Sequence, residues 1–335
     1  MTKRATMNDI ALAAGVSQAT VSLVLNEVTN ARVSSTTRRK VKDLASDMGY
    51  PSKPALTRTG VSIIGLLIDD VTSTPFAPPF LEGARAAAAE RGTLIATFCT
   101  GADPATEAAA LQILHATGAK GVLYTTLVTR SVKPPARLAT LPAILLNCHD
   151  TARRFPCVIP ADADGAMTAT AALIAAGHRR IAHLAGENWG EAARDRAQGY
   201  RRALAAHGIP YDPALQTGPA WTVASGRDHT HHLLNLPDPP TAIFCFNDRV
   251  AIGCYEALHD RGLNVPHDVS VIGFDNDDLG ANLQPPLTTM VLPHDEMARF
   301  AVATLLNAQG PLPHSRSHIP CDLFQRASIA PPKPL

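Results

Sequence analysis

The side chains best suited to contact DNA lie near the N-terminus, in Ser17, Gln18 and Ala19. Ser is a favoured helix cap, so Ser17 is expected to begin a helix whose first outward-facing side chains are Gln18 and Ala19. A Gln amide can form two hydrogen bonds with adenine, and an Ala methyl can contact the methyl group of thymine. This order of residues predicts a helix that reads base edges in the major groove.

The residues just before this helix support the same interpretation. Gly15 can form a tight turn, small Ala11 lets two helices cross closely, and Val16 is expected to fill the space between them. Each feature alone also fits an ordinary three-helix bundle. Together they are typical of a helix-turn-helix.

A second set of polar residues has the chemistry to bind a small hydroxylated molecule. Asn247, Asp248 and Asp275 each follow a predicted strand, at the edge where open α/β sheets bind their ligands. Arg196 lies near the start of a predicted helix, and Trp221 lies in a loop. Planar polar groups pair with neighbouring hydroxyls, and an aromatic ring stacks on a flat apolar face.

Two of these residues also have simpler interpretations. An Asp at a helix start is usually a cap, and we expect that role for Asp248. Arg196, taken alone, would be a surface arginine. Similarly, His229, His231 and His232 have no carboxylate or Cys partner at ligand spacing, so we expect a solvated helix face there and no metal site.

The elements that must position these residues fall into two parts. Residues 6–50 predict three short helices, with Gly49 ending the third. The apolar positions expected to face inward in these helices are Ile10, Ala11, Ala14, Val21, Val24, Leu25, Val41, Leu44, Ala45 and Met48.

From residue 61 the pattern changes to alternating strands and helices. The predicted strands are 61–68, 94–98, 121–124, 143–146, 181–184, 242–246 and 269–273. The predicted helices are 80–91, 105–117, 165–176, 192–207, 225–236 and 249–261. This alternation indicates parallel sheets covered on both faces, and its two series indicate two doubly wound lobes. The expected fold class is therefore α/β behind an all-α head.

The charge distribution separates the same two parts. Residues 1–60 contain nine Lys or Arg and four Asp or Glu, a net charge of +5. The remaining residues contain 21 Lys or Arg and 25 Asp or Glu, a net charge of −4. A basic head on an acidic body fits a head that meets phosphates.

The segment from Thr6 to Asn26 closely resembles the lactose-repressor (LacI/GalR) family. The resemblance continues along nearly the whole chain, through Gly177-His178-Arg179-Arg180-Ile181-Ala182, Phe246-Asn247-Asp248, Val271-Ile272-Gly273-Phe274-Asp275 and Leu323 with Arg326 and Ser328. It implies a sensor like a type I periplasmic binding protein behind the helix-turn-helix. It also implies a homodimer that binds a near-palindromic double-stranded DNA operator.

The resemblance implies a set of DNA-contacting residues, which are Thr6, Ser17, Gln18, Ala19, Ser22, Leu23, Ser34, Arg38 and Leu56. Thr6, Ser34 and Arg38 would hold phosphates. Leu23 stands where many members carry Arg. The linker is about four residues shorter than is usual in the family, and Leu56 is either a minor-groove wedge or an ordinary linker contact.

The resemblance also places residues in an effector pocket between the lobes. Four of them belong to the C-terminal lobe, namely Arg196, Trp221, Asn247 and Asp275. Phe76 and Asn147 fall in segments that line the pocket from the other lobe. Leu292 replaces a polar residue common in the family, which suggests a less hydroxylated ligand edge. The implied effector is a sugar or sugar derivative.

The predicted domain boundaries follow from these patterns and from the resemblance to the family. We expect a DNA-binding domain at 1–50 and a linker at 51–61. The N-terminal sensor lobe is expected at 62–160 with 293–320, and the C-terminal lobe at 161–292 with 321–330. Tetrameric members of the family that this chain resembles add a C-terminal helix with leucine heptads, which bundles four chains. The tail 329–335 has three prolines and no leucine heptads, so we expect a dimer and not a tetramer.

Other classes of protein are disfavoured. A solute-binding protein for transport has the same two lobes, but it needs a signal peptide and lacks a basic head. An enzyme needs a nucleophile, base or phosphate-loop motif, and we find none, so no catalytic residue, cofactor or metal is expected. The sequence contains no uninterrupted run of about 18 apolar residues, so no membrane span is predicted. The six cysteines form no C-x-x-C pair, which indicates buried, reduced thiols in a cytoplasmic protein.

Overall fold

The structure is a computed structural model that describes residues 5–25, 33–50, 61–72 and 76–333. It divides into two compact units, residues 1–61 and residues 62–335. Leu56 and most of the predicted linker lie outside the described residues.

The first unit contains the three predicted helices, α1 (Met7–Ala14), α2 (Gln18–Leu25) and α3 (Ser35–Asp47). Local residues define their ends. Thr6 and Asp9 form a capping box at the start of α1, and Gly15 ends that helix at φ 69°, a conformation that suits glycine. The Oγ of Ser34 accepts a hydrogen bond from the Thr37 N–H at 3.1 Å and so caps α3.

The head packs around a small apolar core. Its buried residues are Ile10, Ala11, Ala14, Val21, Val24, Val41 and Ala45. Val16 is partly buried against them, as the turn between α1 and α2 predicts. The prediction for Met48 was wrong, because this side chain is 36% exposed where α3 ends.

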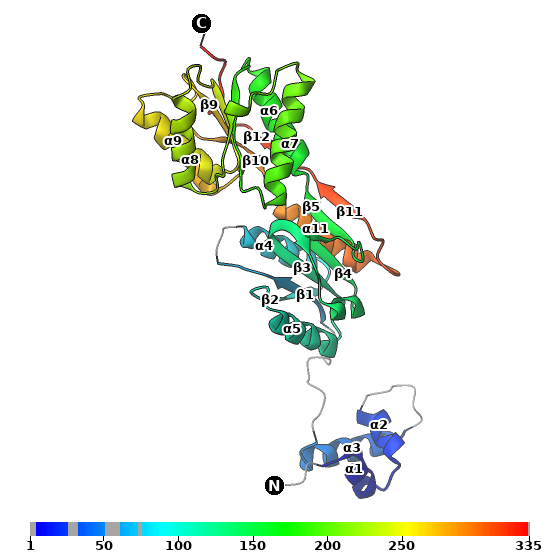
Figure 1. The fold of residues 1–335 in the computed structure, drawn as a ribbon. Coiled ribbons are helices and arrows are strands. Elements are labelled where there is room, and N and C mark those ends of the chain that lie inside the picture. The colour runs from blue at the N-terminus through cyan, green and yellow to red at the C-terminus, as the bar shows by residue number, and fades with distance from the viewer. Residues whose placement is uncertain (1–4, 26–32, 51–60, 73–75, 334–335) are drawn as a thin grey trace. The chain divides into compact units, whose positions relative to one another are not determined.

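The second unit contains two six-stranded sheets, each of which builds one lobe (Figure 1). The N-terminal lobe contains β1 (Ser62–Ile68), β2 (Thr93–Cys99), β3 (Gly121–Val132), β4 (Ala143–Asp150), β5 (Cys157–Pro160) and β11 (Arg316–Ile319). The strand order is β11-β5-β4-β3-β1-β2, and every neighbouring pair is parallel.

The C-terminal lobe repeats this architecture. It contains β6 (Ile181–Leu184), β7 (Gln216–Thr217), β8 (Ala242–Cys245), β9 (Ser270–Asp275), β10 (Thr288–Val291) and β12 (Leu323–Phe324). The strand order is β12-β10-β9-β8-β6-β7, with only β12 antiparallel to its neighbour in the described part of the chain. Because β11 and β12 lie in different sheets, the chain changes lobe near its end.

Helices cover both faces of each sheet. In the N-terminal lobe, α4 (Ala77–Ala89) and α11 (His294–Asn307) bury one face, and α5 (Pro104–Thr117) buries the other. In the C-terminal lobe, α6 (Asp162–Ala175) and α7 (Glu191–Ala206) lie opposite α8 (Val223–Leu234) and α9 (Asp248–Asp260). Two doubly wound lobes confirm the predicted fold class.

Several details differ from the predictions. β3 extends to Val132, eight residues beyond the predicted end, with a register shift between Thr125 and Arg130. The short strands β5, β7, β10, β11 and β12 and the helices α10 (Asp278–Ala281) and α11 were not predicted. Among the cysteines, Cys99 is exposed, and the other five are buried free thiols.

In the described ranges, no single helix is both long and apolar enough to cross a membrane. The helices α1 and α2 pass that test only as a pair, and a break bends them by 106°.

Candidate functional site

The surface predicted to read DNA is formed by the start of α2. Ser17, Gln18 and Ala19 are exposed, and Leu23 is 37% exposed on the same helix. The Oγ of Ser17 accepts a hydrogen bond from the Thr20 N–H at 3.1 Å, which caps α2. The cap orders the first turn of the helix, so Gln18 is presented to solvent from a fixed backbone.

The residues predicted to hold phosphates lie at helix starts. Thr6 caps α1 and Ser34 caps α3, so both hydroxyls bond within their own helices. Helix N-termini attract anions through their N–H groups, and a phosphate can bind there without a free hydroxyl. Arg38 is half-buried and its Nε donates to the Val33 carbonyl oxygen at 3.3 Å, which holds the guanidinium near the start of α3.

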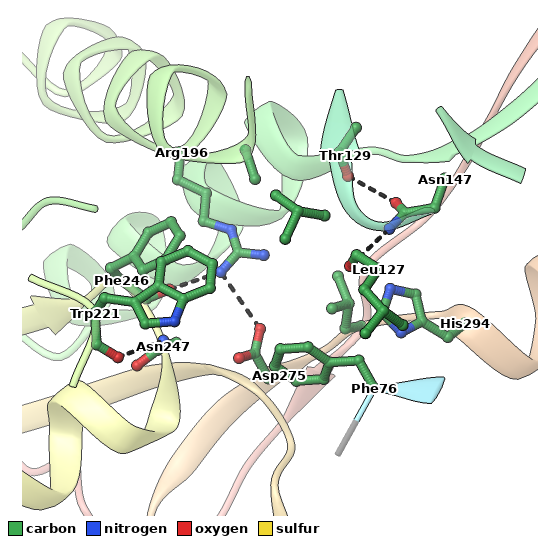
Figure 2. Close-up of a pocket in the computed structure, with 13 residues that line it drawn as sticks. Phe76, Leu127, Thr129, Asn147, Arg196, Trp221, Phe246, Asn247, Asp275 and His294 are labelled. Atoms are coloured by element: carbon green, nitrogen blue, oxygen red, sulfur yellow. Dashed lines mark hydrogen bonds and ion pairs between the residues drawn. The ribbon is translucent and has the colours of Figure 1, made fainter. Parts of the chain in front are cut away.

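A pocket lies within the second unit between its two lobes (Figure 2). It is lined from the N-terminal lobe by Phe76, Leu127, Val128, Thr129, Asn147 and His294. From the C-terminal lobe it is lined by Ala192, Arg196, Trp221, Phe246, Asn247, Asp275 and Leu292. All six residues predicted for the effector site therefore line one cavity. Its free volume is about 30 Å³, room for one or two water molecules.

Arg196 is the central charged group of the pocket and is only 3% exposed. Its Nε donates to Asp162 Oδ1 at 2.8 Å, and its Nη1 donates to the Phe246 carbonyl oxygen at 2.6 Å and to Asp275 Oδ1 at 3.4 Å. The guanidinium carbon lies 3.6 Å from the centroid of the Phe274 ring. These contacts hold the guanidinium rigidly, and in the described residues its Nη2 makes no hydrogen bond, which leaves that nitrogen for a ligand.

Asp275 faces Arg196 from the end of β9, in a strained backbone conformation with φ 111°. Burial raises the pKa of this carboxyl well above its usual range, and the adjacent Arg196 charge opposes that rise. A buried carboxylate that pairs loosely with its arginine can accept hydrogen bonds from ligand hydroxyls.

Asn247 and Trp221 form the other part of the C-terminal wall. The Oδ1 of Asn247 caps α9 by accepting from the Val250 N–H at 2.8 Å, and its Nδ2 donates to the Trp221 carbonyl oxygen at 3.3 Å. The Trp221 and Phe246 rings lie 5.3 Å apart. Figure 2 shows the indole beside Asn247 and the Arg196 guanidinium. The C-terminal wall of the pocket thus combines a polar edge, from Asn247, with an aromatic face, from Trp221.

The structure corrects the role expected for Asp248. Asn247, not Asp248, caps α9. The buried Asp248 carboxylate instead accepts from the Asp277 N–H at 2.7 Å and from the Thr289 hydroxyl at 2.6 Å. Gly273 permits this packing, because a Cβ there would lie 2.1 Å from Asp248 Oδ1. Asp248 therefore anchors the loop that follows Asp275.

Asn147 is engaged within its own lobe. Its Nδ2 donates to the carbonyl oxygens of Thr126 and Leu127 at 2.9 and 3.0 Å, and its Oδ1 accepts from the Thr129 hydroxyl at 2.7 Å. The side chain shapes the loop 126–129, which lines the pocket. Phe76 is half-buried and packs edge-on against His294, with ring centroids 5.9 Å apart.

His294 and Phe246 line the pocket but were not predicted. His294 was missed because it opens α11, a helix that was not predicted from the sequence. The solvated histidine face was predicted correctly only in part. His232 is exposed, whereas His229 and His231 are half-buried. His229 bonds to the Thr217 hydroxyl at 2.9 Å, and His231 contacts Asp260 at 3.3 Å.

A capped helix-turn-helix and a two-lobed sensor with a polar pocket define the class of ligand-responsive DNA-binding regulators. Comparison with known proteins supports this class. Residues 6–52 match the model described as bacterial regulatory proteins, lacI family, and residues 170–329 match the periplasmic binding protein-like domain.

The similar curated proteins cover almost the whole chain. The transcriptional regulator DegA of Bacillus subtilis is 31% identical over 98% of this chain and 99% of its own. The ribose operon repressor of Haemophilus influenzae is 32% identical over 90% of this chain and 91% of its own. The chain therefore belongs to the LacI family, and it is a sequence-specific DNA-binding transcriptional regulator that responds to a ligand.

Solved structures agree with this assignment. The lac repressor dimer bound to operator and the anti-inducer ONPF has a TM-score of 0.68 and 27% identity, over 98% of this chain and 100% of its own. The regulator CelR in complex with cellobiose has a TM-score of 0.66 and 28% identity, over 97% of this chain and 100% of its own.

Proposed function

We propose that this protein is a homodimeric repressor of sugar or related catabolic genes. Residues 1–50 bind a near-palindromic operator, and a sugar or sugar derivative binds between the lobes at 62–160 with 293–320 and at 161–292 with 321–330. Similar proteins support this proposal, since one is named for the ribose operon and another binds cellobiose.

One observation carries the choice of ligand, namely the grouping of Arg196, Asp275 and Asn247 beside Trp221. Arg196 and Asp275 offer a donor and an acceptor to neighbouring hydroxyls, and the indole offers an apolar face. The cavity holds too little free volume for a sugar ring, so we infer that the lobes separate to admit the ligand and that the lining side chains rearrange as the lobes close around it.

The DNA-contacting set remains that of the sequence prediction. Gln18, Ala19 and Ser22 would contact base edges, and Leu23 would make an apolar contact in place of a guanine-binding arginine. The helix starts at Thr6 and Ser34 would bind phosphates together with Arg38.

Two experiments test this function. A gel shift of the full chain against the DNA upstream of its own gene should show specific binding that weakens steeply with salt, because Lys and Arg displace counterions from phosphates. A thermal-shift screen with D-ribose, D-glucose, D-galactose and cellobiose should identify the effector, since a ligand at 100 times its Kd stabilises a protein by about 2.7 kcal/mol. Failure of all four sugars to stabilise the protein contradicts the sugar proposal.

A further inference from the structure

The N-terminal wall of the pocket has three polar side chains among its described lining residues, Thr129, Asn147 and His294. The first two bond to each other, and both amide hydrogens of Asn147 are used by backbone carbonyls. The Nε2 atom of His294 is fully buried and has no hydrogen-bond partner among the described residues. A buried polar atom without a partner destabilises a protein, so its presence in a pocket needs an explanation.

The imidazole of His294 is held firmly in place. The residue is 2% exposed at the start of α11, and its ring stacks on Phe80 with centroids 4.0 Å apart and planes 25° apart. Phe76 packs against it edge-on. Figure 2 shows the ring on the opposite side of the pocket from Trp221, beside Leu127.

The contacts of the ring determine which nitrogen carries the hydrogen. The Phe76 backbone favours the protonated form of the imidazole, as a nearby carbonyl oxygen does. Since Nε2 has no partner among the described residues, we infer that Nδ1 faces that carbonyl and carries the hydrogen. Burial, aided by the Arg196 charge, lowers the pKa of His294 to about 3, so the ring is neutral at pH 7. Nε2 therefore presents a bare lone pair.

We propose that Nε2 of His294 accepts a hydrogen bond from a hydroxyl group of the effector, at the end of the ligand opposite Arg196. This inference rests on the proposed function and narrows its ligand. A carboxylate or phosphate at this end would place an acceptor against a lone pair, so any acidic group must point toward Arg196. The fitting ligand carries hydroxyls along one edge and at least one O–H on the other, between apolar walls that include Leu127 and Leu292.

A matched pair of variants tests this role. His294→Asn places an amide near the position of Nδ1 and keeps a donor for the Phe76 carbonyl, but it removes the acceptor. His294→Gln places an amide oxygen near the position of Nε2. With the sugar that binds the wild type most tightly among D-ribose, D-glucose, D-galactose and cellobiose, His294→Asn should raise Kd about tenfold. His294→Gln should stay within about threefold.

The same titration with monodeoxy derivatives of that sugar identifies the hydroxyl. One derivative should bind the wild type about tenfold more weakly than the parent sugar does, but should bind His294→Asn as well as the parent sugar does. The reason is that the missing hydroxyl and Nε2 of His294 form one hydrogen bond, which the variant has already lost. Nitrogen-15 spectra of the free protein at pH 7 should show His294 neutral, with the hydrogen on Nδ1.

Several results would overturn the inference. They are wild-type affinity in His294→Asn, equal losses in both variants, which would indicate packing on Phe80 alone, and a ring with hydrogen on Nε2. Each of these leaves the proposed function standing. If no sugar binds the wild type, the proposed function fails first and this inference falls with it.

Discussion

His149 on β4 of the N-terminal lobe and Glu191 at the start of α7 in the C-terminal lobe form a direct bridge between the lobes. The Nε2 of His149 lies 2.9 and 2.8 Å from the two carboxylate oxygens of Glu191. His149 follows the pocket residue Asn147 by two positions, and Glu191 precedes the pocket residue Ala192. The bridge therefore holds the two walls of the pocket together.

We predict that Glu191→Gln weakens effector binding about fivefold. The variant keeps a neutral hydrogen bond but loses the charge, which costs about 1 kcal/mol in the arrangement where the lobes enclose the ligand. Calorimetry with the identified sugar measures the change. Glu82→Gln is the control, because the Glu82–Arg85 pair is exposed and lies within one lobe. Equal Kd values for all three proteins would contradict the prediction.

The buried arginine supports a second prediction. Arg196→Lys should lower the free energy of unfolding by about 3 kcal/mol, because one ammonium cannot hold Asp162, Asp275 and the Phe246 carbonyl together. Arg227→Lys is the control, since the Arg227–Asp260 pair is largely exposed. Urea unfolding measures both. A loss below 1 kcal/mol for Arg196→Lys would show that these contacts stabilise little.

The His149–Glu191 bridge and the contacts of Arg196 show why the amino-acid sequence alone predicts only part of the pocket. The strand and helix alternation is a local pattern, so most elements were predicted to within a few residues. The pocket residues Asn247 and Asp275 were predicted because they follow recognisable strands. The two carboxylate partners of Arg196 are 34 and 79 residues away in the chain, and no local pattern marks them.

The errors have the same origin. Asn247 and Asp248 are both good helix caps. Which of them caps α9 depends on Thr289, 41 residues away from Asp248, because the Thr289 hydroxyl donates a hydrogen bond to the Asp248 carboxylate. The strands β5, β10, β11 and β12 have two to four residues each and pair with segments distant in the chain. Residues 293–320 were expected in the N-terminal lobe, but no helix was predicted there, so His294 could not be placed in the pocket.

A third prediction concerns pH. Burial raises the pKa of Asp248 to about 7, so its contribution to stability is complete below its unfolded pKa, near 4, and is lost as pH rises toward 7. Asp248→Asn removes this penalty and keeps an acceptor for the Asp277 N–H. The free energy of unfolding of the variant should therefore rise relative to that of the wild type by roughly 1 to 4 kcal/mol between pH 4 and pH 8.

Urea midpoints of both proteins at pH 4, 6 and 8 measure this gain. Asp103→Asn is the control, because Asp103 is an exposed cap whose pKa is lowered by its bonds to Thr106, so its difference from wild type should stay flat above pH 4. A constant difference between Asp248→Asn and wild type over this range would show that Asp248 is ionised throughout.

A fourth prediction separates base reading from phosphate binding. Gln18→Ala should change the preferred base at one position of each half-site, whereas Arg38→Ala should weaken binding to all sequences alike and reduce its salt dependence. Selection of binding sites from random DNA compares the two variants with the wild type. An unchanged consensus for Gln18→Ala would exclude the base-reading role.

The central claim is that a ligand in the pocket controls operator binding. The most direct measurement is the anisotropy of fluorescein-labelled operator titrated with the full chain, with and without the sugar found by thermal shift. The sugar should change the operator Kd of the wild type at least fivefold, a coupling of about 1 kcal/mol. Asp275→Ala should bind operator with the wild-type Kd and not respond. No response in the wild type, or an equal response in Asp275→Ala, would contradict the claim.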